Sequence, residues 1–337
     1  MDKSHPFSRA RLSDSAQRRP HPGRRAVIAG LAAVCLPGQL AAQEAVALSV
    51  VTTTGMIADA ARRIGGTRIA VRGLMGPGVD PHAYRQTRSD IAALAGADLV
   101  LWHGLGLEAQ LMAFLADMAR SRRVVAVADA IPPDQLRPFA DYPGRYDPHL
   151  WMVPALWLQV VDAVHAAITE ADPAGAAGYA IAAATYRDEI LALSDYAAGM
   201  LATVPAPARV LVTAHDAFGY FGEAYGFEVL GVQGISTESE AGVQRITALV
   251  DLLVTRNITA VFVESSVSDR ALRALVEGAA ARGHEVSIGG TLYSDAMGPD
   301  GTYEGTYVGM IDHNVTTIAR ALGGTAPARG MAGRLGS

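Results

Sequence analysis

Residues 174–203 read AGAAGYAIAAATYRDEILALSDYAAGMLAT, a stretch without an internal proline. Its Ala, Leu and charged residues favour one long helix. Pro173 suits the first turn of that helix, and Pro205 and Pro207 end it. At 1.5 Å per residue the helix would be about 45 Å long. We interpret it as a rigid connector between two lobes, with a solvent-facing helix of a single domain as the alternative.

Short apolar runs alternate with helical stretches on both sides of this connector. The strands expected before it are residues 46–52, 68–74, 98–102 and 123–128, with helices at 56–64, 89–95, 107–120 and 154–170. The strands expected after it are 209–214, 227–232, 260–264 and 285–290, with helices at 216–225, 242–256, 269–282 and 307–322. Such alternation predicts an α/β fold with two lobes, each a four-stranded, mainly parallel sheet with flanking helices.

The domain boundaries follow from these elements. We expect a signal peptide over residues 1–42, an N-terminal lobe over 43–172 and a linker helix over 173–204. A C-terminal lobe over 205–323 and a flexible tail over 324–337 complete the chain, because the last residues are rich in Gly, Ala and Arg.

The N-terminus has the form of an export signal. Arg24-Arg25 precedes the apolar run 26–36, and small residues follow at Ala41-Ala42. This pattern predicts a secretory signal cleaved after Ala42, with the paired arginines pointing to twin-arginine export. A disordered tail followed by a buried helix is the alternative. Cys35 is the only cysteine, but Val34 is bulkier than lipoprotein processing usually tolerates. A soluble periplasmic product is therefore favoured over a lipoprotein.

Composition excludes some classes of partner and ligand. Residues 1–42 hold seven Lys or Arg against two Asp or Glu, which leaves 21 basic and 31 acidic side chains beyond them. An acidic body argues against nucleic-acid binding, which needs a basic face. After cleavage the chain has no cysteine, so a bound metal would be held by nitrogen and oxygen ligands.

Candidate ligands follow the predicted strands, where sites form in parallel sheets. His82 follows strand 68–74, His149 lies in the connection after 123–128, His215 directly follows 209–214, and Asp295 follows 285–290. Three imidazoles and one carboxylate suit Zn²⁺ and are acceptable to Mn²⁺ or Fe²⁺, and a bidentate carboxylate would favour Mn²⁺.

The tripeptide Asp-Pro-His occurs twice in the N-terminal lobe, ending at His82 and His149. Proline restricts the backbone before each histidine and so helps to hold the imidazole. The roles of His103 and Glu264 stay open: each follows a strand and could support a ligand, and Glu264 could instead cap the helix near Asp269. The remaining histidines of the mature chain are interpreted as structural: His165, His284 and His313.

Several motifs resemble the zinc/manganese receptor family of ABC transporters, often called TroA-like, over residues 50–321. They are Val51-Thr52-Thr53-Thr54-Gly55-Met56-Ile57, Gly104-Leu105-Gly106-Leu107-Glu108, Ala214-His215-Asp216-Ala217-Phe218-Gly219-Tyr220-Phe221, Gln233-Gly234-Ile235-Ser236-Thr237 and Ser294-Asp295-Ala296-Met297-Gly298. The resemblance implies two α/β lobes joined by a rigid helix, with the metal between them. Its four ligands fall on His82, His149, His215 and Asp295.

Two departures bear on this resemblance. The family often continues Asp-Pro-His-x-Trp-x-Asp, and Val153 stands in place of the last residue, which puts the support of His149 in doubt. The His- and acid-rich loop common in dedicated zinc receptors is absent between Asp129 and Tyr146, which argues against a zinc-only role.

The function that the resemblance implies is that of an extracytoplasmic solute-binding receptor. It would capture Mn²⁺ or Zn²⁺, with Fe²⁺ less favoured, and deliver the ion as a monomer to a cognate ABC permease in the cytoplasmic membrane. The alternative is an exported mononuclear metallohydrolase, which would keep one coordination position open for water. A metal-dependent adhesin is a third class, which no repeat or binding module in the sequence supports.

Overall fold

The computed structural model describes residues 47–139 and 143–336. The predicted signal peptide, its cleavage after Ala42 and the lone Cys35 lie outside these residues. No helix in the described part of the chain is both long enough and apolar enough to cross a membrane.

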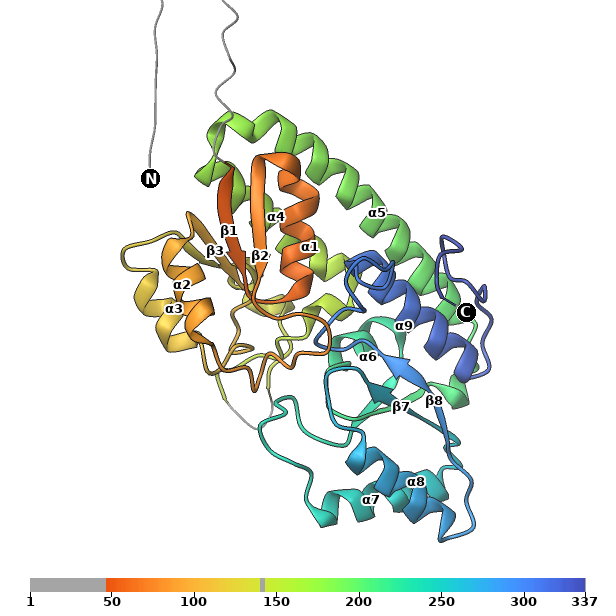
Figure 1. The fold of residues 1–337 in the computed structure, drawn as a ribbon. Helices are drawn as coiled ribbons and strands as arrows, with labels where there is room; N and C mark the ends of the chain where they lie inside the picture. Colours follow the sequence, from red (N-terminus) through yellow and green to blue (C-terminus); the bar gives the residue numbers. More distant parts are fainter. Residues whose placement is uncertain (1–46, 140–142, 337) are drawn as a thin grey trace, which may run out of the picture. The chain divides into compact units, whose positions relative to one another are not determined.

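The first lobe is built on a parallel sheet with the strand order β2-β1-β3-β4 (Figure 1). The strands are β1 (Leu48–Thr52), β2 (Ile69–Gly73), β3 (Leu99–Trp102) and β4 (Val124–Ala126). The helices are α1 (Gly55–Gly65), α2 (Arg88–Gly96), α3 (Met112–Met118) and α4 (Pro154–Ala171). Val50 and Val51, whose side chains point to opposite faces of β1, are both buried, as expected for a central strand covered on two sides.

The second lobe repeats this topology with the strand order β6-β5-β7-β8, again parallel throughout. The strands are β5 (Val210–Thr213), β6 (Glu228–Gly231), β7 (Ala260–Glu264) and β8 (Ser287–Leu292). The helices are α6 (Gly219–Tyr225), α7 (Val243–Thr255), α8 (Arg270–Ala280) and α9 (Tyr307–Ala321). The predicted α/β fold with two four-stranded sheets is therefore confirmed. Strand β8 begins two residues later than expected, which places Asp295 three residues beyond its end.

Helix α5 (Ala176–Ala202) is one uninterrupted helix, preceded by a 3₁₀ turn over Pro173–Gly175. It packs against α1 and α4 of the first lobe and against α6 and α9 of the second (Figure 1). Its buried residues recur every three or four positions, from Tyr179 through Ala183, Tyr186, Ile190, Leu193 and Ala197 to Leu201. This spacing places them along one face, which runs over both lobes. The predicted connector helix is confirmed.

Helix α3 is shorter than the helix expected over residues 107–120, because the residues before Met112 form turns and not a helix. Gly104, Leu105 and Gly106 all have positive φ angles, of 90°, 53° and 82°. Glu108 is buried and accepts hydrogen bonds from the backbone N–H groups of His103 (2.7 Å) and Gly104 (3.2 Å). A side chain turned back onto the end of β3 in this way delays the start of the helix to Met112.

The segment beyond α9 contacts the second lobe. The N–H of Met331 donates to both carboxylate oxygens of Asp312 at 2.9 Å, and Leu335 is buried. The guanidinium of Arg334 lies over the ring of Tyr303. These contacts do not favour the flexibility predicted for residues 324–337, which stays a prediction.

Candidate metal centre

The four predicted ligands come together between the lobes. His82 follows β2 and His149 lies just before α4, whereas His215 follows β5 and Asp295 follows β8. Their candidate ligand atoms all lie within 4.8 Å of one another, and all four residues are buried. The strands of each sheet are parallel, so the loops at their carboxyl ends lie on the same side of the sheet. Each lobe contributes two of the four side chains from that side.

The distances among these side chains suit a metal ion. The Nε2 atoms of His82 and His149 are 3.2 Å apart. The carboxylate of Asp295 lies 3.7 Å from Nε2 of His82, 3.4 Å from that of His149 and 3.1 Å from that of His215. Ligand atoms in a tetrahedron around an ion at about 2.1 Å are roughly 3.4 Å apart. The observed spacing therefore leaves room for one transition-metal ion.

The environment of Asp295 is the strongest indication of a bound cation. Its side chain is buried, and neither carboxylate oxygen accepts a well-aligned hydrogen bond from the described residues. A buried carboxylate without such bonds is costly unless a cation lies beside it. The neighbouring imidazoles hold the pKa of Asp295 well below its usual range despite burial, which by itself would raise it. The carboxylate is therefore ionised and faces the three Nε2 atoms.

His149 is oriented by the aspartate of its own Asp-Pro-His tripeptide. Its Nδ1–H and its backbone N–H both donate to Oδ1 of Asp147, at 2.7 and 3.0 Å. Arg137 donates to the other oxygen at 3.0 Å. Burial opposes the charged imidazole, but Asp147 and Asp295 outweigh it and raise the pKa of His149 to about 9. The Nε2 atom is left facing the centre, as expected for a ligand held from behind by a carboxylate.

Glu264 plays the corresponding part for His215. Its Oε1 accepts a hydrogen bond from the backbone N–H of His215 at 2.8 Å, and its Oε2 lies 2.5 Å from Nδ1 of the ring. The second contact has the distance of an ion pair, although it is not aligned as a hydrogen bond. Burial would lower the pKa of His215, but Glu264 and Asp295 raise it well above its usual value. Glu264 therefore orients this imidazole. Its contacts do not favour the alternative role as a cap of the helix near Asp269.

His82 has a different environment. Its backbone N–H donates to Oδ1 of Asp80 at 2.9 Å, so the same local turn recurs as at Asp147 and His149. Burial is the main cause of a pKa lowered to about 3. This ring stays neutral at physiological pH, and its nitrogen needs to lose no proton before it binds a metal.

His103 lies behind the group rather than in it. It is buried and donates from Nε2 to the backbone carbonyl of Pro148 at 2.8 Å, and its ring packs edge-on against Trp151. Burial lowers the pKa of His103 to about 3. A neutral imidazole bonded to Pro148 supports the loop that carries His149, which answers the question that the sequence left open.

The other histidines of the described residues lie outside the group of four, which agrees with their interpretation as structural residues. Nε2 of His284 donates to the carbonyl of Ile258, and that of His313 donates to the carbonyl of Thr291. His165 lies within α4. None of them is among the residues whose ligand atoms cluster in the described part of the chain.

Val153 does not weaken the support of His149. Asp147, and not residue 153, holds the imidazole. Val153 is buried in the core just before α4, whose first residue is Pro154. The supporting aspartates Asp80 and Asp147 were missed in the sequence. The repeated Asp-Pro-His could have indicated this role. An aspartate side chain can accept a hydrogen bond from the backbone N–H of the residue two positions later, which here is the histidine.

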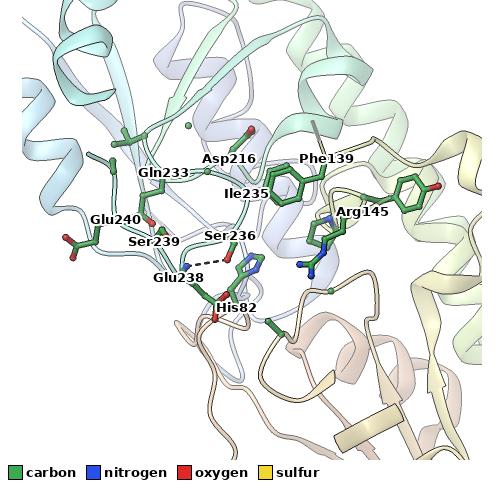
Figure 2. Close-up of a pocket in the computed structure, with 18 of the residues that line it drawn as sticks. His82, Phe139, Arg145, Asp216, Gln233, Ile235, Ser236, Glu238, Ser239 and Glu240 are labelled. Carbon is green, nitrogen blue, oxygen red and sulfur yellow. Dashed lines mark hydrogen bonds between the residues drawn. The ribbon is translucent and has the colours of Figure 1, made fainter. Parts of the chain in front are cut away.

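A cavity of about 610 Å³ reaches the group from one side (Figure 2). Its walls come from both lobes, and His82 is the one member of the four among its lining residues. Asp295 instead borders a smaller cavity of about 80 Å³. The imidazole of His82 thus faces the larger opening.

This chain is similar to known proteins along most of its length. Residues 50–321 match the family described as zinc-uptake complex component A, periplasmic. The manganese-binding lipoprotein MntA of Bacillus subtilis is 48% identical over 276 residues, covering 82% of this chain and 90% of that protein. The zinc-binding protein TroA of Treponema pallidum is 45% identical over 273 residues, covering 81% and 88%.

A solved structure agrees with these sequence matches. The periplasmic zinc-binding protein TroA of Treponema pallidum superposes with a TM-score of 0.80 at 44% identity, over 82% of this chain and 99% of that one. The family match over residues 50–321 spans both lobes, the connector helix and the four clustered residues. The chain therefore belongs to the ZnuA/TroA family, the extracytoplasmic metal-binding receptors of ABC transporters.

Proposed function

We propose that this chain captures one Mn²⁺ or Zn²⁺ ion with His82, His149, His215 and Asp295 and delivers it to a cognate ABC permease in the cytoplasmic membrane. The observation that carries the proposal is the buried Asp295 carboxylate, which lacks aligned hydrogen bonds and faces three imidazole nitrogens. We further propose that the protein acts as a monomer in the periplasm after removal of residues 1–42. A cation supplies the charge and the ligand bonds that this centre lacks.

Four protein ligands favour a transport receptor over the metallohydrolase that the sequence left as an alternative. A catalytic zinc ion keeps an open position for water, whereas four side chains from two lobes would close the coordination sphere. The matched family and relatives are described by metal uptake and metal binding, and the chain is accordingly a receptor and not an enzyme.

The choice of metal depends on how Asp295 binds. Its Oδ1 faces His149 and its Oδ2 faces His82 and His215, so both oxygens are directed toward the centre. A bidentate carboxylate would raise the coordination number to five and favour Mn²⁺, whereas a single oxygen would complete a tetrahedron for Zn²⁺. Of the two similar proteins named above, one is described as manganese-binding and the other as zinc-binding. Fe²⁺ is the less favoured third ion.

The test is native purification followed by metal analysis and by competition between Mn²⁺ and Zn²⁺. We expect one equivalent of divalent metal per chain, and we expect the bound ion to be lost on mixing with the permease. Stoichiometry of zero under metal-replete growth would contradict capture, and unchanged occupancy in the presence of the permease would contradict delivery.

A further inference from the structure

An irregular segment of the second lobe forms one wall of the 610 Å³ cavity. It connects β6 to α7 over residues 232–242, and we call it the β6–α7 segment. It supplies most of the second lobe's share of the lining, including Gln233, Ser236 and Glu240 (Figure 2). Because His82 is the ligand that this cavity reaches, the segment covers the side from which an ion would approach His82.

Hydrogen bonds tie the β6–α7 segment to the first lobe. The hydroxyl of Thr237 donates to Oδ2 of Asp80 at 2.5 Å. The amide of Gln110 donates to Oε1 of Glu238 at 2.7 Å. Gln110 and Glu238 are exposed, whereas Thr237 and Asp80 are half-buried. Bonds that compete less with water contribute more, so the Thr237–Asp80 bond is the stronger tie.

The lobes also meet deeper in the molecule, where the contacts are buried. The indole N–H of Trp151 donates to the carbonyl of Ser294 at 2.8 Å, and the hydroxyl of Tyr220 donates to the carbonyl of Asp147 at 2.8 Å. These buried bonds lie beside the ligand loops and are costly to break. The Thr237–Asp80 bond, in contrast, is only part-buried, and its residues lie close in the chain to residues that line the cavity, Ser236 and Glu238 beside Thr237 and His82 two positions after Asp80.

Asp80 connects this tie directly to a ligand. Its Oδ1 accepts the backbone N–H of His82, and its Oδ2 accepts the hydroxyl of Thr237. Asp147 makes the same turn with His149, but its second oxygen bonds to Arg137 of its own lobe. The two Asp-Pro-His tripeptides therefore share one local structure and differ in the lobe to which the second oxygen is bonded.

We propose that the Thr237–Asp80 hydrogen bond is a latch that holds the β6–α7 segment closed over His82 and thereby limits the rate of metal exchange. The inference rests on the proposed function. Thr237 and Asp80 act as positioning residues, since the ion itself is held by the four ligands. Opening the latch lets the segment move away from the cavity while the ligand set stays intact, so association and release both become faster.

The test compares Thr237→Val, which removes the hydroxyl, with Thr237→Ser, which keeps it. Loss of one hydroxyl–carboxylate bond is expected to speed metal release to a chelator and metal association about tenfold each, which corresponds to about 1.4 kcal/mol. The dissociation constant should stay within about threefold because both rates change together. Thr237→Ser should restore the slow rates. Both are measured by stopped flow with Mn²⁺ and with Zn²⁺.

Thr247→Val is the matched control. Its exposed hydroxyl donates to the carbonyl of Val243 in its own helix. This variant should release metal at the rate of the unsubstituted chain. Equal release rates for Thr237→Val and the unsubstituted chain would overturn the latch, and so would acceleration by Thr247→Val to the same degree.

Hydrogen exchange in the metal-free protein separates the latch from the metal chemistry. Amides of residues 232–242 should exchange faster in Thr237→Val than in Thr237→Ser, while the amides of β5 and β7 stay unchanged. If the unsubstituted chain bound no divalent metal, the proposed function would fail and the kinetic role of the latch with it. If it bound metal but Thr237→Val altered neither rate nor exchange, the latch alone would be wrong.

Discussion

At the scale of single residues, each side chain of the centre has a neighbour that determines its state. Asp147 and Glu264 hold protonated imidazoles at His149 and His215, whereas burial keeps His82 neutral. Asp295 is ionised among them. In the metal-free centre, protons on His149 and His215 therefore partly offset the negative charge of Asp295, and an incoming cation must displace them.

Removing a proposed ligand tests the proposed metal centre directly. His82→Ala deletes a nitrogen and Asp295→Ala deletes the carboxylate, and each should weaken metal binding more than about 100-fold, beyond the usual effect of a supporting residue. His165→Ala, in α4 and away from the centre, is the control and should bind as the unsubstituted chain does. Competition with a chelator of known affinity measures all three, and equal affinities would rule out the ligand assignment.

The orienting carboxylates should matter less than the ligands but more than surface acids. Asp147→Asn and Glu264→Gln keep the side-chain shape and remove the charge behind an imidazole, so each should weaken metal binding by about 10- to 100-fold. Asp162→Asn is the matched control, because Asp162 is an exposed partner of Arg187 on the surface of α4. The same chelator titration applies. If Asp147→Asn and Glu264→Gln both left the metal affinity unaltered, the imidazoles of His149 and His215 would be held by packing alone.

Metal binding should strengthen as the pH rises. The folded-state pKa of His149 is about 9 against 6.5 for a free imidazole, so its proton stabilises the metal-free fold fully below about pH 6.5, and this stabilisation is lost toward about pH 9. A metal at Nε2 must displace that proton at low pH but not at high pH. The metal-induced rise in Tm should therefore grow across this window, and it should grow less steeply in Asp147→Asn. A metal-induced rise in Tm that stays constant across this pH window would contradict the prediction.

At the scale of elements, buried polar contacts join helices from both lobes. Oδ2 of Asp59 in α1 accepts the hydroxyl of Tyr186 in α5 at 2.9 Å and the backbone N–H of Tyr307 in α9 at 3.1 Å. Burial raises the pKa of Asp59 despite these bonds. One carboxyl thus links the connector helix to a helix of each lobe.

Tyr186→Phe should destabilise the fold by removing one of these bonds while keeping the ring. We expect a loss of about 2 kcal/mol in the free energy of unfolding, because a buried carboxyl loses a donor. Thr185→Val is the control on the same helix, since its hydroxyl bonds to the carbonyl of Ile181 at an exposed site. It should change the stability by less than about 0.5 kcal/mol. Urea denaturation compares them, and equal losses would remove the special role of Asp59.

At the scale of the whole molecule, an unbroken helix and a shared core restrict movement of the lobes. The main hydrophobic cluster contains residues of both lobes and of α5, such as Ile57, Ile190 and Ile311. A hinge that opened widely would have to break this cluster, whereas small tilts and loop shifts leave it packed. Metal release is therefore expected to act through shifts of loops, namely the β6–α7 segment and the loops that carry His215 and Asp295, and not through wide opening of the lobes.

Solution scattering and hydrogen exchange together test this expectation. The radius of gyration should be the same with and without bound metal, because the lobes keep their packing on α5. Protection from exchange should increase on metal binding in residues 214–218 and 293–298, next to the ligands of the second lobe. A clear decrease in the radius of gyration on metal binding would show instead that the lobes close as rigid bodies.

The sequence by itself was enough for the two βα series, the connector helix and the four candidate ligands. These depend on local properties: apolar periodicity, the prolines around residues 174–203 and the position of a side chain after a strand. The early start predicted for α3 failed, because Glu108 turns back onto the N–H groups of His103 and Gly104, a contact that no periodicity reveals.

Only the tertiary structure decided which carboxylates hold the centre and how the lobes are joined around it. Glu264 reaches His215 from a different strand, and Thr237 bonds to Asp80 across 157 residues of chain. Asp59 connects α1 to α5 and α9 in the same way. Glu264 and His215 meet because their strands are neighbours in one sheet, whereas Thr237 and Asp80 meet between the lobes and Asp59 meets its partners between packed helices. The residue types can be read from the chain, but their partners depend on packing between segments far apart in sequence.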